Sequence, residues 1–340
     1  MSASVDCSGK PQTVQPPMPS HSICLQQSMQ KLSTSSTIVP QPPQRAGSAK
    51  SRTVREAPFR APAMCMPHLS RTNSRRTSAT VADLFDSRTR IKRRERAFRA
   101  GPALFLYERA FDDILDRLSG IRRNFESALL IGTPDPEWPK RLERFATKVQ
   151  SVDPGAGFGE AAGGIQADAD LIDFPEASFD LCVALGTLDT VNDLAGALLR
   201  LRYVLRPDSL LIGAIAGGDS LPQLRAAMRA ADAVSGGATP RVHPRIEAAS
   251  LGQLLAAAGF HLPVIDVDRV KVSYPGLRDL VRDLRAMGMT NVLSQRTRSP
   301  LSRAALAAAE DRFNRGQEGG RTTKTFELLH FAGWTPQAGS

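Results

Sequence analysis

Between residues 127 and 216, short apolar segments alternate with stretches of helical period, and this rhythm most constrains the fold. Segments such as "LCVAL" and "LLIGAIA" are apolar throughout, which is typical of parallel strands covered by helices on both faces. Two later segments, "PVIDVDRVKVSY" and "KTFELLHFAGW", predict antiparallel strands at the sheet edge. The sequence therefore predicts an α/β fold with a mostly parallel sheet, whose parallel strands are Ala128–Ile131, Lys148–Val152, Gly164–Asp168, Phe179–Leu185 and Leu210–Ala216.

Composition divides the chain into three parts. Residues 1–78 are rich in Ser, Thr, Pro and Gln and poor in acid, which predicts a disordered basic tail. Two explanations of this tail stay open: a transit-type leader, or a start codon assigned too far upstream. Residues 79–126 predict N-terminal helices, and residues 127–335 predict one α/β domain. Within that domain, the Gly/Ala segment 155–164 is expected to be a flexible linker.

Charge and cysteine content exclude several classes of protein. The net charge is +10, but residues 1–100 carry 17 Lys and Arg against 5 Asp and Glu, so the remainder is nearly neutral. A neutral body argues against a broad nucleic-acid-binding face. No apolar run approaches the ~18 residues of a membrane span, and no C-x-x-C pair occurs. The basic run from Arg88 to Arg99 is either a solvated helix face or a contact with an acidic partner or a lipid surface.

Ligands of open α/β sheets bind beyond the carboxyl ends of the strands, so residues at those ends are candidates. Gly132 ends the first strand. Asp153 ends the second, about twenty residues later, where a carboxylate suits a ribose diol. Asp153 is equally an ordinary turn former before a proline. Asp168 follows the third strand, with Asp170 and Asp173 as competitors in the same loop.

The segments "ADADLIDFPEASFDLCVAL" and "LRYVLRPDSLLIGA" resemble motifs of class I S-adenosylmethionine-dependent methyltransferases. The resemblance narrows with "LFDSRTRIKRRERA", "IRRNFESALLIG" and the terminal "FAGW". These are similar to the group containing the mitochondrial complex I assembly factor five, which is related to the malonyl-carrier-protein methyltransferase of biotin synthesis. The resemblance covers about residues 81–335. It implies a Rossmann-like class I methyltransferase fold with an N-terminal helical lid.

The resemblance also implies site residues and S-adenosylmethionine as cofactor. The residues matched to cofactor binding are Ile131, Gly132, Asp153, Asp168, Ala184 and Leu185. Asp219 and Tyr274 are candidates for the acceptor side. No metal ligands and no catalytic residue are assigned.

The first glycine motif departs from the family pattern. Leu130 replaces an acidic residue, and Pro134 and Pro136 replace glycines. A proline has no N–H and fixes φ near −65°, so two donors and the local backbone freedom are both lost. This departure weakens the expectation that S-adenosylmethionine binds.

Three functions stay open from the sequence. The first is S-adenosylmethionine-dependent methyl transfer to an unidentified protein or small-molecule acceptor. The second is a non-catalytic assembly factor for respiratory complex I, with a complex subunit as partner. The third is an arginine-hydroxylating relative. No nucleic-acid partner is expected, and peripheral membrane contact stays open. The expected location is the cytoplasm of a bacterium, or the mitochondrial matrix if the tail is a leader.

Overall fold

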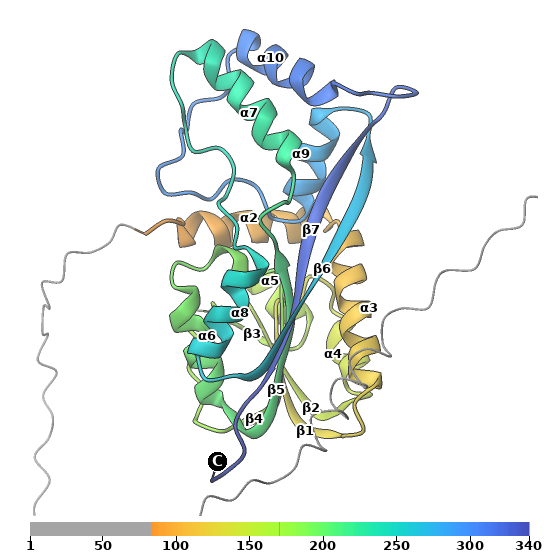
Figure 1. Ribbon diagram of the computed structural model, residues 1–340, viewed down its shortest axis with the longest axis vertical. Coiled ribbons are helices and arrows are strands. Elements are labelled where there is room, and N and C mark those ends of the chain that lie inside the picture. Colours follow the sequence, from red (N-terminus) through yellow and green to blue (C-terminus); the bar gives the residue numbers. More distant parts are fainter. Residues whose placement is uncertain (1–82, 170, 340) are drawn as a thin grey trace, which may run out of the picture. The chain divides into compact units, whose positions relative to one another are not determined.

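The computed structural model describes residues 83–169 and 171–339. Predictions that fall on residues 1–82, including the tail, lie outside the described residues. The helices and strands, drawn in Figure 1, are α2 Ser87–Ala100, α3 Phe105–Ser119, β1 Phe125–Ile131, α4 Trp138–Leu142, β2 Ala146–Asp153, α5 Ala156–Ala161, β3 Ile165–Gln166, β4 Phe179–Leu185, η1 Leu188–Thr190, α6 Leu194–Val204, β5 Leu205–Ala216, α7 Pro222–Ser235, α8 Ala248–Ala257, β6 His261–Tyr274, α9 Leu277–Ala286, α10 Arg303–Asn314 and β7 Thr322–Trp334.

The seven strands form one sheet in the order β3-β2-β1-β4-β5-β7-β6. Strands β1 to β5 pair in parallel, whereas β7 pairs antiparallel with both β5 and β6. The predicted mostly parallel sheet with an antiparallel edge is confirmed. The predicted third strand, Gly164–Asp168, is shorter in the structure and covers Ile165–Gln166.

Helices cover both faces of the sheet, which explains why its central strands are apolar at every position. Ala128 and Leu130 of β1 face a core built with α3. Leu129 and Ile131 point to the opposite side, into a core shared with α6 and α8. Figure 1 shows this division, with α3 and α4 on one side of the sheet and α6 and α8 on the other.

The N-terminal helices differ in how deeply they are built into the domain. One face of α3 is apolar and buried, and Phe111 and Ile114 have no exposed surface. Helix α2 buries only Arg90, Arg94 and Ala97. It crosses the end of the sheet where the parallel strands finish (Figure 1), and Gly101 separates it from α3, with φ 85°.

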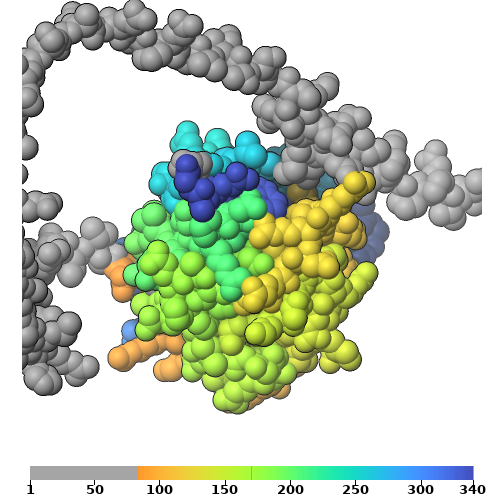
Figure 2. Space-filling model, turned by 90° about the horizontal axis from the view of Figure 1, so that it is seen from below, coloured from red at the N-terminus to blue at the C-terminus, as the bar shows by residue number. Residues whose placement is uncertain are grey.

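At the opposite end of the sheet, the residues that follow β7 are hydrogen-bonded to the first part of β5. The Thr335 N–H donates to the Ser209 carbonyl over 2.8 Å, and Asp208 N–H donates to the Pro336 carbonyl over 3.0 Å. Figure 2 views this end and shows the C-terminal residues, in dark blue, lying against residues coloured green. The candidate site lies at the end where the parallel strands finish, beneath α2, because ligands of open α/β sheets bind beyond the carboxyl ends of the strands.

The segment predicted as a flexible linker is in part a helix. Residues Ala156–Ala161 form α5 because Phe158 is buried, at 3% exposure. The Phe158 ring meets the Phe98 ring edge-on at 5.1 Å. The glycines serve close packing here, since a Cβ at Gly159 would lie 2.9 Å from the Ile165 carbonyl oxygen.

Candidate functional site

The order of the strands reverses between β1 and β4, and their carboxyl ends lie side by side. Gly132 follows β1 with φ 87°, and an added Cβ there would overlap the carbonyl oxygen of Leu185 at the end of β4. A positive φ and a contact this close both require glycine. The first glycine of the motif therefore has a structural role in bringing these two strand ends together.

Asp153 ends β2 and is fully buried. Its Oδ1 accepts from Arg94 Nε at 2.7 Å and from Gly155 N at 2.8 Å. Its Oδ2 accepts from Arg94 Nη2 at 2.6 Å and from Thr133 N at 2.8 Å. Two oxygens have about four lone-pair sites in all. The chain itself therefore fills the whole hydrogen-bonding capacity of this carboxylate.

The partner of Asp153 comes from α2, in the basic run. Burial alone would lower the pKa of Arg94, but the Asp153 carboxylate raises it further, so the guanidinium is charged. Its carbon also lies 5.0 Å from the centre of the Phe158 ring. For Arg90 and Arg94, the structure rules out a solvated helix face, because each is 5% exposed.

Asp168 lies in the loop after β3 and is 9% exposed. Its Oδ2 accepts from Arg90 Nη2, and Arg90 Nη1 also donates to the Thr190 carbonyl over 2.8 Å. The other oxygen, Oδ1, is buried without a hydrogen-bond partner among the described residues. Asp168 therefore keeps one acceptor available to a ligand.

Two N–H groups of the loop after β1 are bonded to aspartate side chains of the chain itself. Thr133 N–H donates to Asp153 over 2.8 Å. Pro134 and Pro136 have none. Glu137 N–H donates to the Asp135 side chain over 2.8 Å. Helix α4, which follows, has five residues, and Trp138 at its start stacks on Phe111 of α3 with the ring centres 4.2 Å apart. The N–H groups of Thr133 and Glu137 are therefore not free to bind an anion.

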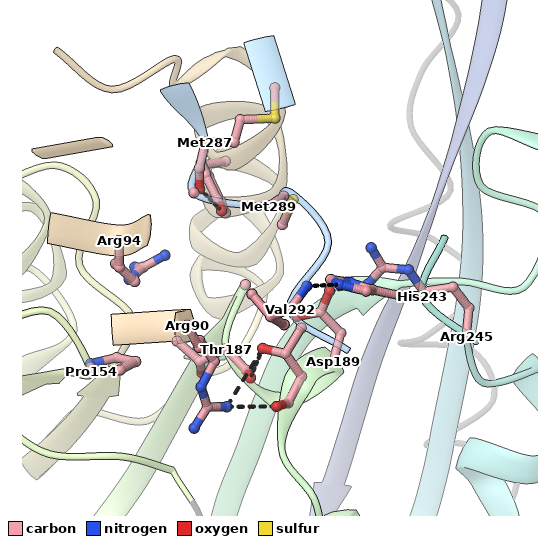
Figure 3. A pocket seen from close by; sticks show the side chains of 14 residues that line it. Arg90, Arg94, Pro154, Thr187, Asp189, His243, Arg245, Met287, Met289 and Val292 are labelled. Atoms are coloured by element: carbon pink, nitrogen blue, oxygen red, sulfur yellow. Dashed lines mark hydrogen bonds and ion pairs between the residues drawn. The ribbon is translucent and has the colours of Figure 1, made fainter. Parts of the chain in front are cut away.

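A cavity opens beside these groups, between α2, the loop after β4 and the segment after α9. Figure 3 shows its lining, including Arg90, Arg94, Thr187, Asp189 and His243. Thr187 Oγ1 and Asp189 Oδ1 are buried and have no hydrogen-bond partner among the described residues. The other oxygen of Asp189 accepts from Arg245.

His243 closes one wall of this cavity in its neutral form. Its Nε2 accepts from Val292 N–H over 2.8 Å, as Figure 3 shows. Burial, with a smaller contribution from Arg245, lowers the pKa of His243 to about 4. The imidazole is therefore an acceptor at neutral pH.

A second, more apolar cavity lies on the β5 side; its empty volume is about 550 Å³, and that of the first cavity is about 390 Å³. Tyr107 and Gly186 border both cavities. The Tyr107 hydroxyl donates to the Met287 carbonyl over 3.0 Å, and burial raises its pKa to about 12. The wall consists mainly of apolar side chains from α3, β4, β5, α9 and β7: Leu106, Ala110, Leu185, Ala214, Ile215, Leu221, Leu284, Met287, Met289, Phe326 and Leu328.

The structure brings some of the residues expected from sequence to these cavities and places others elsewhere. Leu185 lines the apolar cavity, whereas Ile131 and Ala184 are fully buried in the core beneath α6 and α8. Asp219 lies on the surface beside Arg269, with its side chain 67% exposed. Tyr274 is buried in the α3-side core and lines neither cavity.

Sequence reasoning missed Arg90, Arg94, Tyr107, Thr187 and Met289 as residues of the site. A weak signal existed for the two arginines: with Ala97 they recur on one face of α2, four and then three residues apart. Within the described residues, no group of three His, Cys, Asp or Glu side chains is arranged to hold a metal ion. No helix there is both long and apolar enough to cross a bilayer.

Comparison with known proteins shows the family of the chain. The methyltransferase domain family matches residues 104–263. The rat (Rattus norvegicus) protein named arginine-hydroxylase NDUFAF5, mitochondrial, is 33% identical over 272 residues, covering 76% of this chain and 79% of that protein. The chain belongs to the class I methyltransferase family. Its sheet order and helical layers are those of the Rossmann-like fold expected for such a protein.

Two further similar proteins are named methyltransferases. The malonyl-[acyl-carrier protein] O-methyltransferase of Laribacter hongkongensis is 32% identical over 181 residues, covering 53% of this chain and 59% of that protein. The N-methyltransferase NodS of Bradyrhizobium japonicum, solved with S-adenosyl-L-homocysteine, is 15% identical with a TM-score of 0.41, covering 73% of this chain and all of that one (100%). By family, the chain is an S-adenosylmethionine-dependent methyltransferase-like protein.

Proposed function

We propose that this protein binds S-adenosylmethionine at the carboxyl ends of β1, β2 and β4 and supports methyl transfer to an acceptor in the apolar cavity. The observation that carries the proposal is a set of three buried oxygens without hydrogen-bond partners among the described residues: Asp168 Oδ1, Thr187 Oγ1 and Asp189 Oδ1. Unpaired buried polar atoms are rare in folded proteins and cost free energy. A polar ligand would satisfy them.

The residues that would hold the cofactor are Gly132, Asp153 and Asp168, with Thr187 beside them. When bound, the cofactor supplies a methyl group on a sulfonium, which is open to attack by a nucleophile. The residue types suit a nucleoside, because carboxylates accept from ribose hydroxyls. In the arrangement described, however, Asp153 has no lone pair left for a ribose hydroxyl, so binding there requires Arg94 to leave.

The acceptor side contributes position and shielding from water. Apolar walls from α3, β5 and β7 exclude water, and the Met287 and Met289 side chains adapt to irregular shapes. The Tyr107 hydroxyl donates its hydrogen bond to the Met287 carbonyl. Its pKa of about 12 keeps the hydroxyl protonated at neutral pH, so it does not act as a general base. Holding the acceptor in line is therefore the main contribution of the chain to the rate.

A non-catalytic assembly role is the second candidate, and the loop after β1 favours it. Pro134 and Pro136 lack the backbone N–H donors that a cofactor loop normally supplies. Arg94 donates to both oxygens of the Asp153 carboxylate and so occupies acceptor sites that a ribose would use. For such a role we propose a respiratory complex I subunit as the partner. An arginine-hydroxylating activity, as in the name of the rat relative, has no supporting metal-ligand cluster among the described residues.

We place the protein in a bacterial cytoplasm, or in the mitochondrial matrix if the segment before residue 79 is a leader. Relatives with mitochondrial names and bacterial relatives both occur. Expression with and without residues 1–78, followed by fractionation, would decide between the two.

Calorimetric titration of the full chain with S-adenosylmethionine tests the proposed function. We expect saturable heat, with S-adenosylhomocysteine competing for the same site. In Thr187→Val, which removes one unpaired oxygen while keeping the side-chain shape, we expect binding about fivefold weaker. Absence of heat from folded protein at millimolar cofactor would contradict methyl transfer. Recovery of complex I subunits on the immobilised chain would then favour the assembly role.

A further inference from the structure

Helix α2 carries six arginines and one lysine, and it directs two of these side chains into the candidate cofactor site. Arg90 and Arg94 are one helical turn apart, so their side chains share a face. Both are buried, whereas Arg88, Lys92 and Arg96 are exposed. The two buried guanidiniums meet Asp168 and Asp153, the carboxylates that the family resemblance assigns to the cofactor. Helix α2 lies before residues 104–263, which the methyltransferase domain family matches.

The hydrogen bonds of Arg94 to Asp153 occupy acceptor sites that the ribose hydroxyls of a nucleoside would need. It has two parallel N–H···O bonds of 2.6–2.7 Å, the strong geometry of a guanidinium with a carboxylate. Backbone N–H groups of Thr133 and Gly155 take up the rest of the carboxylate. Ribose hydroxyls can bond to Asp153 only in place of Arg94.

We propose that α2 is an intramolecular competitor of the cofactor, and that its arginines must withdraw from Asp153 and Asp168 before a nucleoside binds. This inference rests on the proposed function of the same site. It adds that the structure described here is the closed state, and that the apparent cofactor affinity is set by how often α2 opens.

The way α2 is attached permits this motion. Only three of its residues are buried, against seven in α3. At Gly101, between the two helices, an added Cβ would meet nothing within 4 Å. Outside the site, the start of α2 is held by Arg296, which donates to Asp86 over 3.0 Å and to Thr89 over 2.7 Å. Asp86 N–H also donates to the Val292 carbonyl over 2.8 Å, and Glu95 accepts from Gly157 N–H over 3.1 Å. Withdrawal of α2 would break these contacts while the sheet and α3 stay packed.

Three single variants separate competition from a general loss of charge. Arg94→Met removes the competing guanidinium. Arg296→Ala weakens the hold on α2 without touching either aspartate. Arg93→Met is the matched control, because Arg93 is the neighbouring arginine of α2, and the charges that most affect its pKa are those of Arg296, Arg96 and Asp86 rather than of either carboxylate. We expect the first two to bind S-adenosylmethionine about tenfold more tightly than the unaltered chain, and the control to bind unchanged.

A reversible crosslink provides a test within one protein. The Cβ of Ala97 lies 3.7 Å from the position of a Cβ at Gly288, within the range of a disulfide. Ala97→Cys with Gly288→Cys, in a chain whose Cys7, Cys24 and Cys65 are changed to Ser, would fasten α2 in place. We expect the oxidised form not to bind the cofactor and the reduced form to bind it. Hydrogen exchange of the α2 amides should become faster when the cofactor is added to the unaltered chain.

The outcomes distinguish this inference from the proposed function. Equal binding by the unaltered chain, Arg94→Met, Arg296→Ala and the oxidised crosslinked form would overturn the competition and leave cofactor binding intact. Absence of binding by every form, open or closed, would overturn both. If Arg94→Met does not unfold cooperatively on heating, Arg296→Ala and the crosslinked pair decide the matter.

Discussion

The site has two halves, which lie side by side at the carboxyl ends of the parallel strands but differ in how their polar groups are hydrogen-bonded. At the ends of β1 and β2, hereafter the β1–β2 half, every oxygen of Asp153 is bonded to the chain itself. At the ends of β4 and β5, the β4–β5 half, Thr187 and Asp189 keep unpaired oxygens in the lining of the first cavity, and the apolar cavity lies next to it. The carboxylate of the β1–β2 half therefore stabilises the fold through bonds within the chain. The β4–β5 half keeps unpaired polar groups next to a cavity, as a binding site does.

The largest expected effect comes from breaking the β1–β2 half at its carboxylate. Asp153→Ala leaves the buried Arg94 without its counter-charge, and we expect a loss of about 3–5 kcal/mol in the free energy of unfolding. Thr187→Val, in the β4–β5 half, removes a hydroxyl that has no partner and should change stability by less than about 1 kcal/mol. Urea unfolding of both variants measures the contrast. Equal losses would show that the two halves do not differ as described.

A smaller effect is expected where the two halves touch. Gly132→Ala combines a positive φ with an overlap on the Leu185 carbonyl, and we expect a cost of about 3 kcal/mol. Gly101→Ala is the matched control, because its φ of 85° is similar and its surroundings are open; it should cost about 1 kcal/mol. The difference in unfolding free energy isolates the contact between β1 and β4. Identical costs would mean that the strand ends can separate without loss.

The third prediction concerns pH. Because the pKa of His243 falls from 6.5 to about 4 in the folded chain, the unfolded chain binds more protons between these values. Stability should therefore fall as the pH drops from about 6.5 to about 4, by up to about 3 kcal/mol from this group, and the loss should level off below.

His243→Gln keeps an acceptor for Val292 N–H but does not titrate, so it should flatten this slope. His261 is exposed, and His261→Gln should leave the slope unchanged. Denaturant melts at several pH values check both variants. An unaltered slope in His243→Gln would assign the acid sensitivity to another group.

Much of the fold followed from the sequence because it depends on local pattern. Runs such as Phe179–Leu185 are apolar at every position, and that pattern marks a strand buried on both faces. The bounds of β4 agree with the prediction. Segment 155–164 was misjudged because glycine content suggests a linker, whereas one buried side chain, Phe158, is enough to anchor a short helix.

The site was less predictable because its decisive contacts join distant parts of the chain. Arg94 and Asp153 are 59 residues apart, and Arg90 and Asp168 are 78 apart. In a helix where half the positions are basic, nothing local distinguishes the two arginines that turn inward. The loss of donors at Pro134 and Pro136 was visible in the sequence, but the guanidinium that fills the same site was not.

The stacking of Trp138 on Phe111 has a spectroscopic consequence. Trp138 has no exposed surface, and its indole N–H donates to Glu108 of α3 over 2.8 Å. The chain has one other tryptophan, Trp334 at the end of β7, and neither is a residue of α2. Intrinsic fluorescence of Trp138 therefore reports on its contact with α3 rather than directly on the position of α2. An optical signal for the withdrawal of α2 requires a fluorophore attached to that helix.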